Sequence, residues 1–246
     1  MKNVTPRGQS VYAPWDIAPP AFAATPDLAR TASSGDRLAR SHPMTASRIF
    51  LLSPAFCGGE RAKLLFNPVA PFPLAVRLRA GGVPIGELFA FLSGLYFRGK
   101  LAYARAFARP PGGAPAALVI TPTRGLVDPD TLLTLDDMRE FAEVNIALQS
   151  DRFLEPLARD AHALARSSES APVILLGSIA TDKYVGTLAA ALGDRLHFPE
   201  AFVGRGDMSR GGLLLRSVRD SAELTYIPVA GATRRGARPA KLEPIR

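Results

Sequence analysis

The sequence predicts an α/β protein, built as a three-layer domain around a mostly parallel central sheet. Three short apolar runs carry this prediction: residues 49–53 (IFLLS), 117–120 (ALVI) and 172–176 (PVILL). Each has the length of a buried strand, and none alternates as a strand with one face in water does. Longer stretches with helical spacing separate them, which is typical of a parallel sheet covered on both faces.

The composition is that of a globular protein from a reducing compartment. The chain has 246 residues, 47% of them hydrophobic, so one domain can bury a large core without metals or disulfides. Cys57 is the only cysteine, which excludes an intramolecular disulfide and favours the cytoplasm. No apolar run approaches the ~20 residues that span a bilayer, and no secretion signal is recognisable. We expect a cytoplasmic protein without membrane contact, and the oligomeric state stays open.

The two ends of the chain differ in composition from its middle. Residues 1–43 are rich in Pro, Ala, Ser and Arg and predict a disordered tail, unless translation begins at Met44. Residues 44–229 are expected to form a single α/β domain, and residues 230–246 a basic disordered tail. These tails carry +2 and +4 of the formal net charge of +8. Such a tail either adds weak, salt-sensitive affinity for nucleic acid or remains a solvated segment.

The first predicted strand leads into a glycine turn and a short helix. Residues 49–53 end at Pro54, residues 55–59 (AFCGG) have turn chemistry, and residues 60–66 have helical spacing. Such a turn leaves backbone N–H groups free for an anion or a base edge. Cys57 is either a thiol with a lowered pKa at this turn or a small buried hydrophobe.

Residues 85–107 predict one or two helices with an aromatic stripe. Their apolar side chains recur at helical spacing, while Arg98, Lys100 and Arg105 are expected on the opposite side. The rings either pack in the core or include one that faces a pocket and stacks on a base.

A second strand, residues 117–120, ends in a long polar turn. Residues 121–130 (TPTRGLVDPD) have turn chemistry throughout, and Asp128 and Asp130 either form this turn or supply a carboxylate to a pocket. Helices are predicted to follow, one beginning near Thr134 and one over residues 151–167.

The C-terminal third repeats the pattern. Residues 172–176 lead through Gly177 and Ser178 into a helix that Gly193 ends. A fourth strand is predicted over residues 195–198, a final helix over 213–219 and a last strand over 223–229, at a sheet edge because of Pro228. Residues 197–215 (HFPEAFVGRGDMSRGGLLL) read as a site loop that runs into an apolar element.

The ends of the predicted strands define a candidate pocket, because parallel sheets bind ligands beyond the carboxyl ends of their strands. The candidate ligand-binding residues are Ser53, Cys57, Gly58, Thr121, Arg124, Ser178, Arg205, Ser209 and Arg210, and the candidate catalytic residue is His197. Arginine forks suit phosphate, although Asp207 could instead pair with either arginine of the last loop. No metal-binding cluster and no phosphate-binding glycine motif is present, so we expect no metal and no cofactor.

The order of these loops resembles the uracil-DNA glycosylase superfamily. Residues 51–59 (LLSPAFCGG) resemble its first loop, residues 119–125 (VITPTRG) its strand ending in Asn, and residues 173–180 (VILLGSIA) a later strand. Residues 197–215 resemble its HPSP loop and the following helix, so the resemblance covers about residues 48–219. The chain also looks like small uncharacterised bacterial α/β proteins that have a GLVDPD-like turn.

The resemblance implies a glycosylase-like fold and a base-directed site, with two departures. Ser53 and Pro54 stand where the family has its water-activating acid, and Thr121 stands near its base-reading Asn. The family's histidine is matched by His197, which either donates to a base carbonyl or caps a loop. Base excision needs a positioned water and a stabilised leaving base, and only the second has a candidate here.

Three functions therefore stay open. The first is a glycosylase-like protein that binds a nucleobase, a nucleotide or nucleic acid, with or without base excision or a related base-directed reaction. The second is a binding module without catalysis. The third is a hydrolase or transferase of a small phosphorylated metabolite that uses Cys57 or Asp128.

Overall fold

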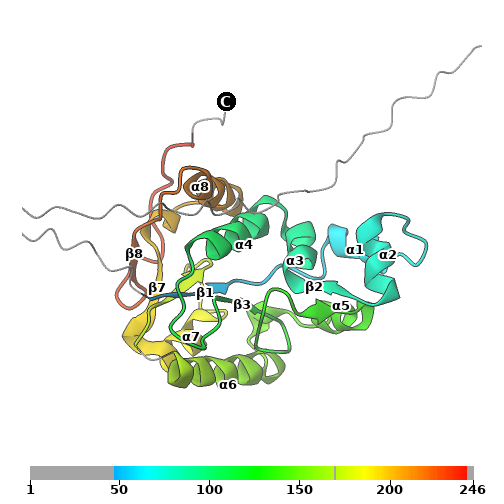
Figure 1. Cartoon of the computed structure of the whole chain (residues 1–246), viewed down its shortest axis with the longest axis horizontal. Helices are drawn as coiled ribbons and strands as arrows, with labels where there is room; N and C mark the ends of the chain where they lie inside the picture. Colours follow the sequence, from blue (N-terminus) through cyan, green and yellow to red (C-terminus); the bar gives the residue numbers. More distant parts are fainter. Residues whose placement is uncertain (1–46, 169, 243–246) are drawn as a thin grey trace, which may run out of the picture. The chain divides into compact units, whose positions relative to one another are not determined.

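A six-stranded sheet lies at the centre of residues 47–168 and 170–242, the part of the chain that this computed structural model describes (Figure 1). The strand order is β4-β3-β1-β6-β7-β8. The four inner strands are mutually parallel, and the two edge strands are antiparallel to their neighbours. The strands are β1 (Ile49–Leu52), β3 (Ala117–Ile120), β4 (Leu126–Val127), β6 (Val173–Leu176), β7 (Leu196–Pro199) and β8 (Tyr226–Pro228). The predicted mixed α/β architecture with a mostly parallel sheet is confirmed.

Two pairs of helices cover the sheet. Helices α4 (Leu95–Phe107) and α8 (Asp207–Arg219) pack together on one side, and α6 (Asp151–Ser167) and α7 (Val185–Leu192) pack together on the other (Figure 1). This arrangement follows from the chain path. The crossover from β1 to β3 moves in one direction along the sheet, and those from β3 to β6 and from β6 to β7 move in the other, so right-handed connections place their helices on opposite faces.

The remaining elements gather beside the sheet around a two-stranded ribbon of β2 (Val83–Pro84) and β5 (Leu132–Leu133). The helix that follows Thr134 begins with a capping box. The Thr134 hydroxyl accepts a hydrogen bond from the Asp137 backbone N–H, and the Asp137 carboxylate accepts one from the Thr134 backbone N–H. The helices here are α1 (Glu60–Phe66), α2 (Pro73–Ala80), α3 (Ile85–Ser93) and α5 (Leu135–Ala142).

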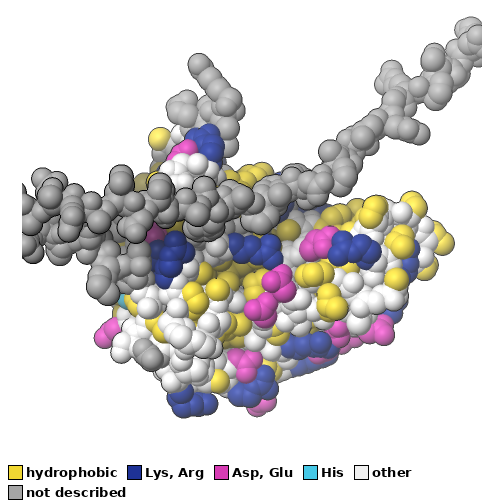
Figure 2. Space-filling model, viewed as in Figure 1, with side chains coloured by type: hydrophobic (Ala, Val, Ile, Leu, Met, Phe, Trp, Pro, Cys, Tyr) yellow, Lys and Arg dark blue, Asp and Glu magenta, His cyan; other side chains and the backbone are white. Residues whose placement is uncertain are grey.

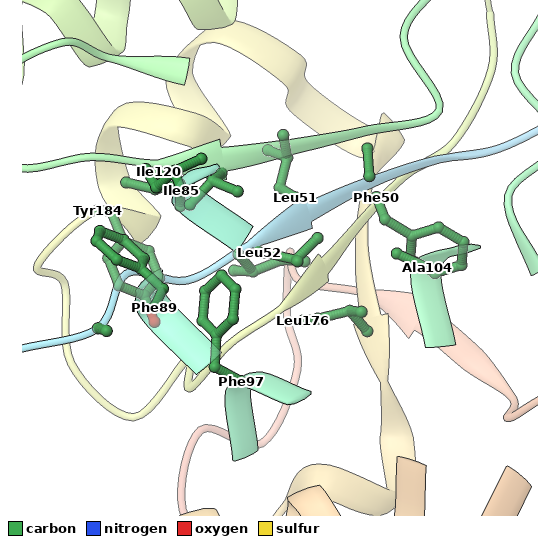
Figure 3. Close-up of a cluster of buried hydrophobic side chains, with 14 of the residues drawn as sticks. Phe50, Leu51, Leu52, Ile85, Phe89, Phe97, Ala104, Ile120, Leu176 and Tyr184 are labelled. Atoms are coloured by element: carbon green, nitrogen blue, oxygen red, sulfur yellow. The ribbon is translucent and has the colours of Figure 1, made fainter. Parts of the chain in front are cut away.

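The core explains why the central strands lack alternation. Every residue of β1 and of β6 is buried, because helices cover both faces of these strands. Side chains from β1 and β6 meet aromatic rings of α3 and α4, as Leu52, Leu176, Phe89 and Phe97 illustrate in Figure 3. The rings of Phe89 and Phe97 pack edge to face, with centroids 5.4 Å apart.

Helix α8 begins six residues before the predicted start at Leu213, so the second part of the predicted glycine-rich loop is helical. The glycines serve the packing of α8 on α4. A Cβ at Gly211 would lie 2.8 Å from the Leu95 carbonyl oxygen, and one at Gly99 would lie 2.8 Å from the Gly211 carbonyl oxygen. Both distances are closer than side chains tolerate, so glycine on each helix permits the close crossing.

The whole predicted N-terminal tail, residues 1–43, and the alternative start at Met44 lie outside the described part of the chain, because residues 1–46 are not described. The segment from residue 230 is described as far as Leu242 and contains no helix or strand. It does contact the domain. Arg234 pairs with Asp182, and Arg205 donates to the Ala240 carbonyl oxygen at 3.4 Å.

No helix among the described residues is long and apolar enough to cross a bilayer. On the face shown in Figure 2, basic and acidic side chains are interspersed. The described residues include exposed ion pairs, such as Arg77 with Glu87 at 2.7 Å and Arg105 with Asp130 at 2.8 Å. Exposed pairs of this kind contribute little to stability.

Candidate functional site

A pocket of about 760 Å³ lies at the carboxyl ends of β1, β3 and β6. Its walls come from the loop after β1, the loop before α7, the start of α8, and residues of α1, α3, α4 and α5. Strands β1 and β6 are neighbours whose chains leave toward opposite sides of the sheet. This is the topological switch point at which doubly wound sheets bind ligands.

Four of the ten predicted site residues line this pocket. They are Ser53, Cys57, Ser178 and Arg210. They come from three separate segments, the loops after β1 and β6 and helix α8, which the sheet and the helix crossing bring together.

Two of the other predicted residues close the turn after β3. The Thr121 hydroxyl donates to the Gly125 carbonyl oxygen at 3.0 Å and accepts from the Arg124 backbone N–H at 2.9 Å. The Arg124 guanidinium pairs with Asp137 and Glu140 of α5. Pro122 is the residue of this turn that lines the pocket.

His197 and Arg205 lie outside the pocket lining. His197 is in strand β7, opposite Ile174 of β6, and its Nδ1 is 3.0 Å from the Arg195 carbonyl oxygen. The histidine therefore precedes the end of its strand instead of following it. Arg205 donates to the Ser209 hydroxyl at 3.1 Å and to the Ala201 carbonyl oxygen at 3.0 Å, which holds the start of α8.

Phe56 supplies an exposed aromatic ring at the pocket. Its side chain is 74% exposed and lines the cavity. The ring lies over the next turn, because a Cβ at Gly58 or Gly59 would lie only 3.1 Å or 3.3 Å from a ring carbon. The two glycines thus leave room for the ring against the backbone. Gly58 therefore affects the position of the Phe56 ring, although Gly58 is not part of the pocket lining.

Arg210 reaches the pocket from α8 and is 9% exposed. Its guanidinium donates twice to the Phe202 carbonyl oxygen, at 3.2 and 3.3 Å, and pairs with Asp207 at 3.3 Å. It also lies over the Phe202 ring, 5.6 Å from the centroid. These contacts compensate a buried charge and fix its position.

Tyr96 of α4 places a buried hydroxyl in the same wall. Its side chain is 5% exposed and lines the pocket, and its hydroxyl has no hydrogen bond of good geometry among the described residues. Burial raises the pKa of this phenol, and the nearby Arg210 opposes that shift. Buried polar groups without a partner are rare in proteins, and the neighbour of this hydroxyl in the pocket wall is the Arg210 guanidinium.

Lys100 is the main residue that the sequence analysis placed incorrectly. It is 1% exposed, and its Nζ donates to the Ser53 carbonyl oxygen at 2.5 Å and to the Ser53 hydroxyl at 2.9 Å. The ammonium lies over the rings of Tyr96 and Phe97, 4.5 and 4.6 Å from their centroids. Burial lowers the pKa of Lys100 to about 7, an effect that the Asp207 carboxylate opposes.

The sequence did contain the signal for this burial. Lys100 is four residues after Tyr96, three after Phe97 and four before Ala104, which places it on the buried side of α4 with all three. A lysine on an apolar stripe is normally expected to extend its ammonium to solvent. Lys100 does not, because its side chain is buried beneath the end of β1.

The two alternative nucleophiles are less suited to reaction. Cys57 is 3% exposed, its Sγ lies 3.5 Å from the Ala55 carbonyl oxygen, and burial raises its pKa to about 12. A thiol with this pKa is protonated at neutral pH and a poor nucleophile. Asp128 accepts from the Asp130 backbone N–H at 2.8 Å, in a turn outside the pocket lining.

Within the described residues, no group of three His, Cys, Asp or Glu side chains could hold a metal ion. The pocket can instead offer an exposed ring, a buried guanidinium, an unpartnered phenol and a serine that is bonded to a buried lysine. Comparison with known proteins adds no relative, because no protein-family model, no curated protein and no solved structure matches the chain.

Proposed function

We propose that the chain binds a nucleotide, or a nucleotide unit of a nucleic acid, in the pocket at the strand ends. The observation that carries this proposal is the position of the exposed Phe56 ring beside a pocket that also contains the Arg210 guanidinium. An exposed aromatic ring suits a base, because stacking on such a ring contributes ~1–3 kcal/mol per base. A guanidinium suits a phosphate.

The pocket also favours a polar ligand over an apolar one. Its lining holds the basic residues Arg61, Lys183 and Arg210 and the acidic residues Glu60 and Asp207. Glu60 pairs with Lys63 at 2.6 Å and Asp207 with Arg210, which leaves Arg61 and Lys183 as lining cations that no described carboxylate pairs with. The Tyr96 hydroxyl could donate to a base carbonyl, the role that the glycosylase resemblance gives to His197.

A glycosylase-like architecture and base excision are part of the same proposal. The loops after β1, β3 and β6 follow one another along the chain in the order that the resemblance implies. Release of a free base would make the protein a base-directed enzyme, and binding without release would make it a module for nucleotide or nucleic-acid recognition. The single cysteine favours a cytoplasmic site of action.

Binding of the full chain to nucleoside mono-, di- and triphosphates and to labelled single-stranded DNA and RNA tests this function. Phe56→Ala should weaken binding about tenfold, as expected for loss of one stacking contact. Val69→Ala is the matched control, because Val69 is 79% exposed and outside the pocket lining.

A salt series separates the pocket from the basic C-terminal segment. Binding that falls steeply with salt but ignores Phe56→Ala and Arg210→Gln would contradict the proposal and leave only non-specific phosphate contacts. Chromatography of the reaction mixture for free base distinguishes the enzyme from the binding module.

A further inference from the structure

We propose that Ser53 and Lys100 form a catalytic pair, in which the Ser53 hydroxyl is a nucleophile toward a phosphoryl group and the Lys100 amine is its general base. This inference rests on the proposed function for its substrate, a phosphate ester or anhydride of the bound nucleotide. The residues themselves can be tested without that substrate.

The geometry is that of a nucleophile and its base. Lys100 Nζ is 2.9 Å from Ser53 Oγ, within the range of about 2.6–3.2 Å found in such pairs. The bond to the Ser53 carbonyl oxygen at 2.5 Å holds the amine in place, as the third group of a triad does. Ser53 lines the pocket, and Lys100 lies behind it.

The serine sits at a point where two loops meet closely. Its backbone N–H donates to the Leu176 carbonyl oxygen at 3.3 Å, which ties the end of β1 to β6. A Cβ at Gly177 would lie 2.9 Å from the Ser53 Cβ and 2.8 Å from the Tyr184 hydroxyl oxygen. That hydroxyl donates to the Ser178 carbonyl oxygen at 3.0 Å and is also within hydrogen-bonding reach of Ser53.

The surroundings of Lys100 favour a neutral amine. Two aromatic rings cover the amine, and no ion pair of Lys100 occurs within the described residues. The charged groups that act on it are Asp207 and Arg210, and the titratable side chain in contact with it is Tyr96. With a pKa lowered to about 7, a large fraction of Lys100 carries a free electron pair near neutral pH.

A purely structural lysine would be a costly way to fasten a strand end. Burial of an unpaired ammonium is unfavourable, and an apolar side chain of similar length would fill the same space without that cost. Desolvated lysines of lowered pKa serve instead as bases and nucleophiles in enzymes.

The proposed step conserves atoms and charge. Ser53 Oγ forms a bond to phosphorus, and its proton passes to the Lys100 amine, which becomes an ammonium. The bond between phosphorus and the leaving oxygen breaks, the leaving oxygen takes the electron pair, and the Lys100 ammonium returns the proton to it. Water then attacks the phosphorus of the phosphoserine and gives a proton to the Lys100 amine. The bond between phosphorus and Ser53 Oγ breaks, Oγ takes the electron pair and receives the proton back from Lys100, and inorganic phosphate or a nucleotide is released.

Diisopropyl fluorophosphate tests the pair directly, because it phosphorylates an activated serine and contains no nucleobase. Ser53 Oγ would bond to phosphorus, fluoride would leave with its electron pair, and Lys100 would take the proton. The expected result is a single adduct on Ser53 of the full-length protein, found by intact mass and peptide mapping. Its rate of formation should rise with pH around a midpoint near 7, as the amine becomes neutral.

Substitutions separate a base from a structural donor. Lys100→Met should lower the labelling rate about 100-fold or more, the usual contribution of general base catalysis. Lys100→Arg should fail to restore it, because a guanidinium still donates hydrogen bonds but does not accept a proton in this range. Ser150→Ala is the matched control and should keep the wild-type rate, because Ser150 is exposed, lies outside the pocket lining and makes no side-chain hydrogen bond to its helix.

Two results would overturn the pair: no adduct on Ser53 of the folded wild-type protein, or full labelling in Lys100→Arg. The pH profile of the wild-type protein decides the question even where a variant does not fold. Labelling without nucleotide binding would reject the proposed ligand and support the catalytic pair. Nucleotide binding without labelling would support the ligand and reject the pair.

Discussion

Lys100 and Arg210 are two buried cations beside one pocket, and they are compensated in different ways. Arg210 donates to a backbone carbonyl oxygen and pairs with Asp207, so its charge is balanced locally. Lys100 has serine oxygens and aromatic rings as neighbours, and burial lowers its pKa to about 7. The same wall thus holds one fixed charge for binding and one titratable amine for proton transfer.

The crossing of α4 and α8 positions both cations, and substitutions at that crossing should change the stability of the protein. Gly211→Ala should lower the free energy of unfolding by ~1–3 kcal/mol, because its Cβ would lie 2.8 Å from the backbone of α4. Gly186→Ala in α7 is the control. A Cβ there meets nothing within 4 Å, so this change should raise stability by ~0.5–1 kcal/mol, the usual gain of alanine in a helix.

Urea unfolding followed by circular dichroism measures both variants. Equal effects of the two substitutions would show that the helices do not need the close approach, and that the cations are positioned in some other way.

The second prediction separates the cations by pH. In the unfolded chain a lysine keeps its proton up to a pH of about 10.4, whereas folded Lys100 loses it near pH 7. Between these values the unfolded state binds more protons, so the contribution of Lys100 to stability rises with pH, by at most ~1.4 kcal/mol per pH unit. The wild-type protein should therefore gain stability relative to Lys100→Met as the pH rises from 7.5 to 9.5.

Arg210→Met is the control for that measurement. A guanidinium does not titrate over this range, so the difference between wild type and this variant should change with pH much less than it does for Lys100→Met, and only through the small effect of Arg210 on the pKa of Lys100. A constant difference for Lys100→Met as well would mean that Lys100 remains an ammonium in the folded protein.

The sequence predicted the parts of this molecule that depend on continuous apolar runs. Strands β1, β3 and β6 were recognisable because each is buried by helices on both sides, and their ends predicted where a pocket would lie. The face of α4 that holds Lys100 was misjudged, because the rule that lysines reach solvent competed with helical spacing, and only packing against β1 decides between them. The close helix crossing at Gly211 was likewise hidden, since glycine in a sequence indicates a turn as readily as a contact.

The glycine-rich stretch after His197 illustrates the same limit. Its residue types suggested a site loop, but β7 includes His197 and α8 includes Arg210, so only the second reaches the pocket. A residue in a strand and a residue on a helix thirteen positions later cannot be placed relative to each other by spacing alone. The sheet register and the helix crossing place them.

Two charged neighbours act on Lys100 in opposite directions. The Asp207 carboxylate raises the pKa of Lys100, and the Arg210 guanidinium lowers it. Asp207→Asn should therefore shift the pH midpoint of Ser53 labelling downward, and Arg210→Met should shift it upward, each by a fraction of a pH unit. Asp207 is mostly exposed, so its loss should change stability by less than ~1 kcal/mol. Opposite shifts, measured on the same adduct, would show that the fixed cation tunes the titratable one. Shifts in the same direction would mean that the midpoint belongs to a group other than Lys100.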